Sequence, residues 1–103
     1  MAFVLRFVQE YAASERDTFM DLEARFAEME RRREGWPVGR RLQPYAGALP
    51  THTLIWEHGF PSLAAAEEAL ALIARDPEHA ELFRRQAPTI TSARTEIYET
   101  LEL

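Results

Sequence analysis

The first strand-like segment of this chain is apolar on both of its faces, and this constrains the fold more than any other feature. Residues 2–11 alternate between two sets, with Phe3, Leu5 and Phe7 on one face and Val4 and Val8 on the other. A strand that faces water on one side would alternate between apolar and polar residues. The pattern therefore predicts a central strand that is covered on both sides.

A second segment, residues 51–60, is also apolar on both faces, because Ile55 lies opposite Leu54 and Trp56. If helices cover one face of such a sheet, something apolar must cover the other, and the simplest cover is a second copy of the chain. We therefore expect a homodimer through the open sheet face, with the following residues at the interface: Val4, Arg6, Val8, Ile55 and Glu57. If the two strands are adjacent, Arg6 and Glu57 can also pair across them; the alternative is that Arg6 lies near water and contributes little.

A helix is predicted over residues 15–34 by an apolar stripe at helical spacing, made of Phe19, Leu22, Phe26 and Met29. Ser14 is the expected N-cap and Gly35 the expected stop. A further strand is expected over 38–46, where Pro44 favours an edge position or a bulge.

Proline and capping residues define the C-terminal half of the chain. Ser62 is the expected cap of a helix that runs to about residue 75, and Asp76 with Pro77 is expected to begin a short third helix. Residues 89–102 are predicted to form the last strand. The order β-α-β-β-α-(α)-β predicts one α+β domain over 1–103, a ferredoxin-like βαββαβ sandwich with an antiparallel four-stranded sheet.

Composition excludes several classes of chemistry. The formal net charge of −5 argues against a nucleic-acid binder, which needs a basic face. The chain has neither lysine nor cysteine, so Schiff-base chemistry, disulfides and thiol nucleophiles are excluded. The N-terminal residues do not resemble a signal peptide, and no apolar run has the length of a membrane span. We therefore expect a cytoplasmic protein that does not bind membranes.

The three histidines do not form a metal site in the sequence pattern. His52 and His58 are separated by roughly 20 Å along a straight strand, and His79 is expected on the surface of the third helix. No metal and no cofactor is predicted, although a heme held by one axial histidine stays open. The glycines and serines match no phosphate loop or nucleophile elbow.

An aromatic stripe on the strand at 51–60 is the best candidate for a binding site. If it faces the helices, it can wall a pocket for a planar apolar molecule, and the alternative is ordinary core packing. The candidate ligand-binding residues are Phe7, Phe26, Trp36, Tyr45, Leu54, Trp56 and His58. The candidate catalytic residues are His52, His58 and Tyr98.

Three segments of the chain resemble those of NIPSNAP-type proteins. They are Trp56-Glu57-His58-Gly59-Phe60-Pro61-Ser62-Leu63-Ala64-Ala65-Ala66-Glu67, Asp76-Pro77-Glu78-His79 and Arg94-Thr95-Glu96-Ile97-Tyr98. The resemblance implies the dimeric α/β-barrel superfamily, in which ferredoxin-like protomers pair sheet to sheet. That superfamily also holds antibiotic-biosynthesis monooxygenases, heme-degrading monooxygenases and small-molecule isomerases. The chain departs from the heme-degrading enzymes because it has no asparagine, which those enzymes use in the pocket.

These observations leave three functions open. The first is binding of a small apolar or aromatic molecule between sheet and helices by a homodimer. The second is a cofactor-independent monooxygenase of the antibiotic-biosynthesis type, and the third is a structural oligomerisation domain without catalysis.

Overall fold

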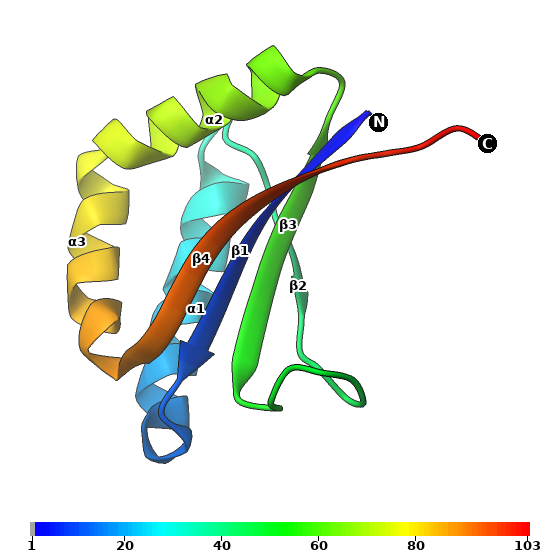
Figure 1. The fold of residues 1–103 in the computed structure, drawn as a ribbon. Coiled ribbons are helices and arrows are strands. Elements are labelled where there is room, and N and C mark those ends of the chain that lie inside the picture. The colour runs from blue at the N-terminus through cyan, green and yellow to red at the C-terminus, as the bar shows by residue number, and fades with distance from the viewer. Residues whose placement is uncertain (1) are drawn as a thin grey trace.

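Strands and helices follow one another along the chain in the order that the sequence predicts. The computed structural model describes residues 2–103. Its elements are β1 (Phe3–Tyr11), η1 (Ala13–Glu15), α1 (Arg16–Arg32), β2 (Arg40–Leu42), β3 (Thr53–Phe60), α2 (Leu63–Arg75), α3 (Pro77–Gln86), η2 (Ala87–Thr89) and β4 (Ile90–Glu99). Figure 1 shows that the strands form one sheet and that the helices lie on one side of it. The α+β ferredoxin-like architecture is confirmed.

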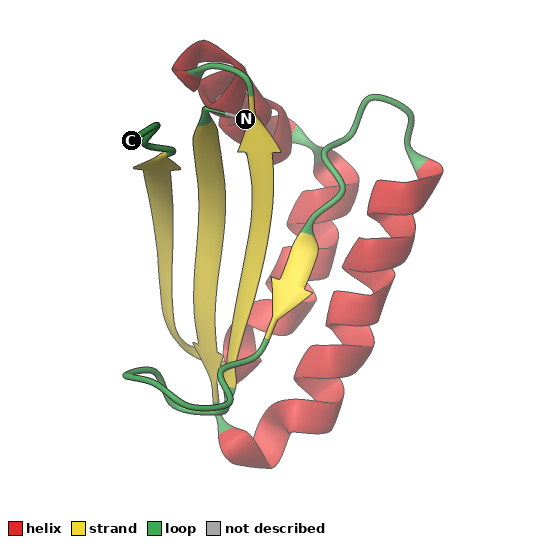
Figure 2. Ribbon diagram, turned by 90° about the vertical axis from the view of Figure 1, so that its right-hand side faces the viewer, coloured by secondary structure: helices red, strands yellow, loops and turns green. Residues whose placement is uncertain are grey.

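The sheet is antiparallel, with its strands in the order β2-β3-β1-β4. β1 and β3 are central and adjacent, which confirms the central position predicted for the first strand. Their register places Phe7 opposite Trp56 on the helix side and Arg6 opposite Glu57 on the other side. Figure 2 shows the helices on one side of the sheet, while the loop between β2 and β3 extends beyond the other. We call these the helix face and the open face.

The core lies between the helix face and the helices because the apolar stripes of both layers meet there. Leu5 and Trp56 pack against Ala66 and Ala69 of α2. Near the start of α1, the rings of Tyr11 and Phe19 stack at a centroid distance of 4.4 Å. The short alanine side chains allow α2 to approach the sheet closely, and this packing fixes the position of β3 beneath the helices.

The predicted helix caps are confirmed at two helices and wrong at the first. The Ser62 hydroxyl accepts a hydrogen bond from the Ala65 N–H, and the Asp76 carboxylate accepts one from the His79 N–H. Ser14 instead lies inside η1, and α1 begins after Glu15 with no side-chain cap. A single 3-10 turn takes the place of the predicted cap and leads the chain directly into α1.

The second strand is much shorter than predicted. The sequence indicated residues 38–46, whereas β2 covers Arg40–Leu42. Pro44 lacks an N–H for the ladder, and pairing with β3 ends at Leu42 opposite Ile55. The chain then forms an irregular loop over residues 43–52, and Tyr45 in this loop is almost fully exposed.

The open face is less apolar than the sequence suggested. Val8 is only 2% exposed and Ile55 only 9%, so a single chain already buries both. The predicted pairing of Arg6 with Glu57 is confirmed, with Arg6 Nε donating to Glu57 Oε2 at 2.9 Å. Arg40 of β2 contacts the other oxygen of the same carboxylate. The face therefore presents a charged cluster to its surroundings.

Within residues 2–103, no helix combines the length and the apolar character that crossing a bilayer requires.

Candidate functional site

A cavity of about 620 Å³ lies between the helix face and the helices. Its walls come from α1, α2, α3 and all four strands. Phe83 of α3 and Thr95 of β4 both line the cavity and both remain exposed, which places its mouth between these two elements. We call this space the interlayer cavity.

Aromatic rings line the interlayer cavity from both the sheet and the helix layer. They come from Phe7, Phe26, Trp36 and Trp56. The strand register places Phe7 beside Trp56, and their rings stack at a centroid distance of 5.0 Å. A wall of this kind suits a flat apolar molecule, because offset stacking adds to the burial of apolar area.

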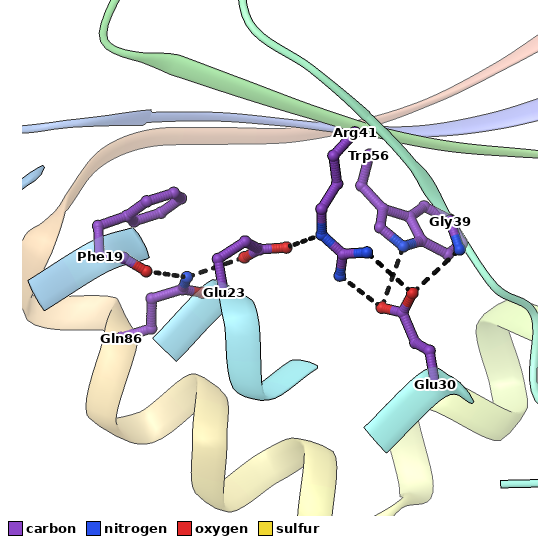
Figure 3. Close-up of polar contacts among 7 residues, drawn as sticks. All are labelled: Phe19, Glu23, Glu30, Gly39, Arg41, Trp56 and Gln86. Atoms are coloured by element: carbon purple, nitrogen blue, oxygen red, sulfur yellow. Dashed lines mark hydrogen bonds and ion pairs between the residues drawn. The ribbon is translucent and has the colours of Figure 1, made fainter. Parts of the chain in front are cut away.

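A buried ionic network closes the cavity toward β2. Arg41 Nε donates to Glu23 at 2.7 Å, while Arg41 Nη1 and Nη2 donate to the two oxygens of Glu30 at 3.0 and 2.6 Å (Figure 3). Burial alone would lower the pKa of Arg41, but the hydrogen bonds and charges of Glu30 and Glu23 raise it above its usual value. The guanidinium therefore stays charged between two carboxylates that are both nearly buried.

The same network reaches three further groups. Trp56 Nε1 donates to Glu30 Oε2 at 3.1 Å, and the Gly39 N–H donates to Glu30 Oε1 at 3.0 Å. Gln86 Nε2, at the end of α3, donates to Glu23 Oε1 at 2.9 Å. Figure 3 shows the chain of contacts from Gln86 to Gly39. It ties α1, α3, β2 and β3 together and fixes the orientation of the Trp56 indole ring.

A second cluster holds Trp36 in the wall. Arg33 forms two hydrogen bonds to Asp76, at 2.6 and 2.7 Å, and its guanidinium lies 4.4 Å from the centroid of the Trp36 ring. The bonds to Arg33 hold the pKa of Asp76 at about 2, against the effect of burial. Asp76 also caps α3, so one carboxylate links the end of α1 to the start of α3.

His79 is half-buried in the cavity wall, which corrects the prediction that it lies on the surface. Its ring lies 4.9 Å from the Phe26 ring. Burial lowers the pKa of His79 below its usual value, although the charges of Asp76 and Glu30 oppose that shift. Among the histidines of the described chain, this is the one that faces the interlayer cavity.

Four of the seven predicted ligand-binding residues meet at the interlayer cavity, namely Phe7, Phe26, Trp36 and Trp56. The structure places the other three elsewhere. Leu54 packs with Tyr11 and Phe19, Tyr45 lies in the exposed loop, and His58 lines a separate groove beside α2. The aromatic stripe is therefore divided between cavity wall and plain core.

The three candidate catalytic residues lie outside the interlayer cavity. His52 precedes β3 and meets the Tyr11 ring edge-on at 6.2 Å. His58 Nδ1 donates to the Val38 carbonyl oxygen at 2.6 Å. Tyr98 lies on the open face, where its hydroxyl donates to Glu96 at 2.9 Å. Within residues 2–103, no cluster of three or more His, Asp or Glu side chains could hold a metal ion.

The polar residues of the cavity were missed in the sequence, although a signal for two of them exists. Glu23 and Glu30 are seven residues apart and share the α1 stripe with Phe19 and Phe26, at spacings of four, three and four. A glutamate on an apolar stripe indicates a buried carboxylate that needs a partner. Nothing in the sequence identified Arg41 or Gln86 as the partners.

Comparison with known proteins supports the fold. No family model matches the chain, and no curated protein matches its sequence. Among solved structures, a NIPSNAP family protein of Agrobacterium tumefaciens gives a TM-score of 0.77 at 16% identity, covering 97% of this chain and 86% of that one. An uncharacterized NIPSNAP domain protein of Burkholderia xenovorans gives 0.73 at 11% identity, covering 93% and 91%.

A candidate antibiotic biosynthesis monooxygenase of Deinococcus radiodurans is also similar, with a TM-score of 0.69 at 13% identity, covering 98% of this chain and 94% of that one. These matches span nearly the whole of each chain. The fold of this chain is therefore the one found in NIPSNAP and antibiotic-biosynthesis-monooxygenase structures, as the resemblance in the sequence suggested. A shared fold hosts many chemistries, so function must be argued from the cavity.

Proposed function

We propose that this protein binds a small, planar, largely apolar molecule in the interlayer cavity. The observation that carries the proposal is the cavity itself, about 620 Å³ in volume and walled by Phe7, Phe26, Trp36 and Trp56. Small-molecule sites typically measure roughly 300–1,000 Å³ and combine apolar walls with a few fixed polar groups. The ionic network around Arg41 supplies such groups at one end.

Filling the cavity tests this proposal. Ala74 of α2 lines the cavity and is exposed, whereas Ala71 of the same helix is exposed and lies outside it. Ala74→Phe should weaken the binding of a naphthalene-type probe by about tenfold or more, because the new ring occupies its space. Quenching of Trp36 and Trp56 fluorescence reports the binding. Ala71→Phe is the matched control, and equal binding by both variants would contradict the proposal.

The structural neighbours favour a second candidate, a cofactor-independent monooxygenase. In such a reaction an anthrone-like substrate and dioxygen would give the quinone and water, with the substrate supplying all the electrons. His79, neutral in the wall beside Phe26, is better placed than His52 or His58 to take a proton from a bound phenol. Oxygen uptake on anthrone- and quinol-like compounds should fall in His79→Ala and persist in His58→Ala. Uptake that is equal in both variants, or absent, would contradict this candidate.

We also propose that two copies pair through the open face, which none of the helices in residues 2–103 covers (Figure 2). Val4 and Tyr98 lie in register there and retain exposed surface that a partner would bury. Val8 and Ile55 offer less apolar surface to a partner than the sequence suggested, because the single chain already buries them. Sedimentation should show a dimer that Val4→Glu dissociates, while Leu63→Glu on exposed α2 surface leaves it intact. A monomer for the unmodified chain would refute the pairing.

A further inference from the structure

The two carboxylates of the cavity network differ in how fully their oxygens are used. Glu30 Oε1 accepts from the Gly39 N–H and from Arg41 Nη1, and Oε2 accepts from Arg41 Nη2 and Trp56 Nε1 (Figure 3). An ionised carboxylate offers about four acceptor positions. Glu30 is therefore saturated by the protein.

Glu23 accepts only half as many hydrogen bonds from residues 2–103. Its Oε2 accepts from Arg41 Nε at 2.7 Å and its Oε1 from Gln86 Nε2 at 2.9 Å. The side chain lines the interlayer cavity and retains 8% of its exposure. About two acceptor positions of Glu23 are therefore left for a donor that enters from the cavity.

Gln86 adds to the surplus of acceptors at this end of the cavity. Its Nε2 also contacts the Phe19 carbonyl oxygen, at 3.3 Å, and this fixes the orientation of the amide. The Gln86 side chain is fully buried, and its Oε1 has no hydrogen-bond partner within the described part of the chain. A buried acceptor without a donor is costly, so the Glu23 end of the network favours a donor group.

The charges of the cavity lining point to the same kind of group. Glu23 and Glu30 carry two negative charges, and Arg41 supplies one positive charge between them. Two further arginines belong to residues around the cavity, and both are solvent-exposed and paired. Arg84 of α3 pairs with Glu81, and Arg94 of β4 pairs with Glu96 on the open face. Solvent screens those pairs, so the interior retains an excess of one negative charge.

We propose that the ligand is a planar aromatic molecule carrying a protonated amino group, and that its N–H groups bind at Glu23 beside Gln86. Its ring system lies against Phe7, Phe26 and Trp56. An aromatic carboxylate is disfavoured, because Arg41 is already neutralised and the nearest free groups are acceptors. This inference rests on the proposed binding function and names its ligand class.

Three matched probes test the inference on the unmodified protein. They are 2-(aminomethyl)naphthalene, naphthalen-2-ylmethanol and 2-naphthoate, which share one ring system and differ in charge. Titration calorimetry at neutral pH and about 0.15 M salt should give the tightest binding for the amine and the weakest for the carboxylate. We expect the dissociation constants of the amine and the carboxylate to differ by about tenfold or more. The excess negative charge of the cavity attracts the amine and repels the carboxylate.

Removal of the excess charge tests the cause. Glu23→Gln should reduce the preference for the amine over the carboxylate by about tenfold, because the network then carries no net charge. Glu28→Gln makes the same change on the exposed side of α1 and should leave the preference unaltered. Circular dichroism shows whether each variant is folded. If a variant does not fold, the comparison of the three probes on the unmodified protein still tests the inference.

The outcomes separate this inference from the proposed function. If the alcohol binds and the carboxylate binds as tightly as the amine, the inference is overturned and the binding function stands. If the two variants shift the preference equally, the assignment to Glu23 is overturned. If none of the three probes binds, the proposed function fails, and the inference fails with it.

Discussion

The two faces of the sheet carry ionic clusters of opposite composition. On the helix face, one arginine, Arg41, lies between Glu23 and Glu30. On the open face, one glutamate, Glu57, lies between Arg6 and Arg40. The glutamates of the helix face are nearly buried, whereas the Arg40 side chain is 72% exposed. The two clusters share their chemistry, and the exposed Arg40 is the member that differs most in its access to water.

This difference decides what each cluster can tolerate. A charge that loses its partner inside the protein must stay desolvated, whereas an exposed arginine can turn to the solvent. The helix-face cluster should therefore lose much stability when a change leaves one of its charges without a partner. The open-face cluster can lose Arg40 at small cost, because that side chain is exposed.

Replacement of Arg41 by methionine should have the largest effect. It leaves Glu23 and Glu30 buried beside each other without a cation, and we expect a loss of about 3–5 kcal/mol in the free energy of unfolding. Arg40→Met is the matched change on the open face and should cost about 1 kcal/mol or less. Urea denaturation measures both variants. Equal losses would show that burial does not distinguish the two clusters.

Gly39→Ala should have the second largest effect on stability, because the added methyl group disturbs the packing of the helix-face cluster. A Cβ atom at position 39 would lie 1.7 Å from Trp56 Nε1, so the indole ring must move and its hydrogen bond to Glu30 is lost. We expect a loss of about 2–4 kcal/mol in stability together with a blue or red shift of tryptophan fluorescence. Val38→Ala, at the exposed neighbouring residue, should change neither quantity appreciably.

The sequence predicted the open-face cluster better than the helix-face cluster, for a physical reason. Arg6 and Glu57 lie on strands whose antiparallel pairing and alternation determine which side chains meet. Glu23, Arg41 and Gln86 come from three elements that meet only when the helices dock. Periodicity determines the face on which a residue lies, but not which residue of another layer lies opposite it.

The local predictions failed where tertiary context overrides propensity. Residues 38–46 have the composition of a strand, yet pairing with β3 stops at Leu42. Glu28 and Arg32 have the spacing of an intrahelical ion pair, yet Arg32 contacts Glu78 of α3. The helices and strands were thus predictable from local pattern. The cavity depends instead on the spatial arrangement of α3 and β4, which local pattern does not determine.

Glu57→Gln removes the charge of the glutamate that lies between Arg6 and Arg40 on the open face. Hydrogen bonds from Arg40, and to a lesser extent from Arg6, hold the pKa of Glu57 below its usual value of 4.5. The charged carboxylate therefore stabilises the fold above that pH, and the contribution is lost as the pH falls below 4.5 through the lower folded pKa. We expect the variant to lose about 1–2 kcal/mol at neutral pH. The difference from the unmodified protein should vanish in strong acid, and a difference that persists there would contradict the charge-based account.

The smallest expected effect is that of His79. It distinguishes the two faces of the sheet by the pH range in which each loses stability. Burial lowers the pKa of His79 below 6.5, so the unfolded chain binds more protons than the folded chain just below that pH. The neutral ring therefore contributes its full stability above pH 6.5, and this contribution is lost as the pH falls below that value. Asp76 and Glu30 oppose the shift, so the effect should be smaller than that of Glu57→Gln. Thermal melts of the unmodified protein and of His79→Gln are compared across this pH range. The melting temperature should fall more steeply with decreasing pH in the unmodified protein, because only that protein carries the imidazole. The helix face would then respond to mild acid and the open face to strong acid, whereas identical slopes would remove His79 from the comparison.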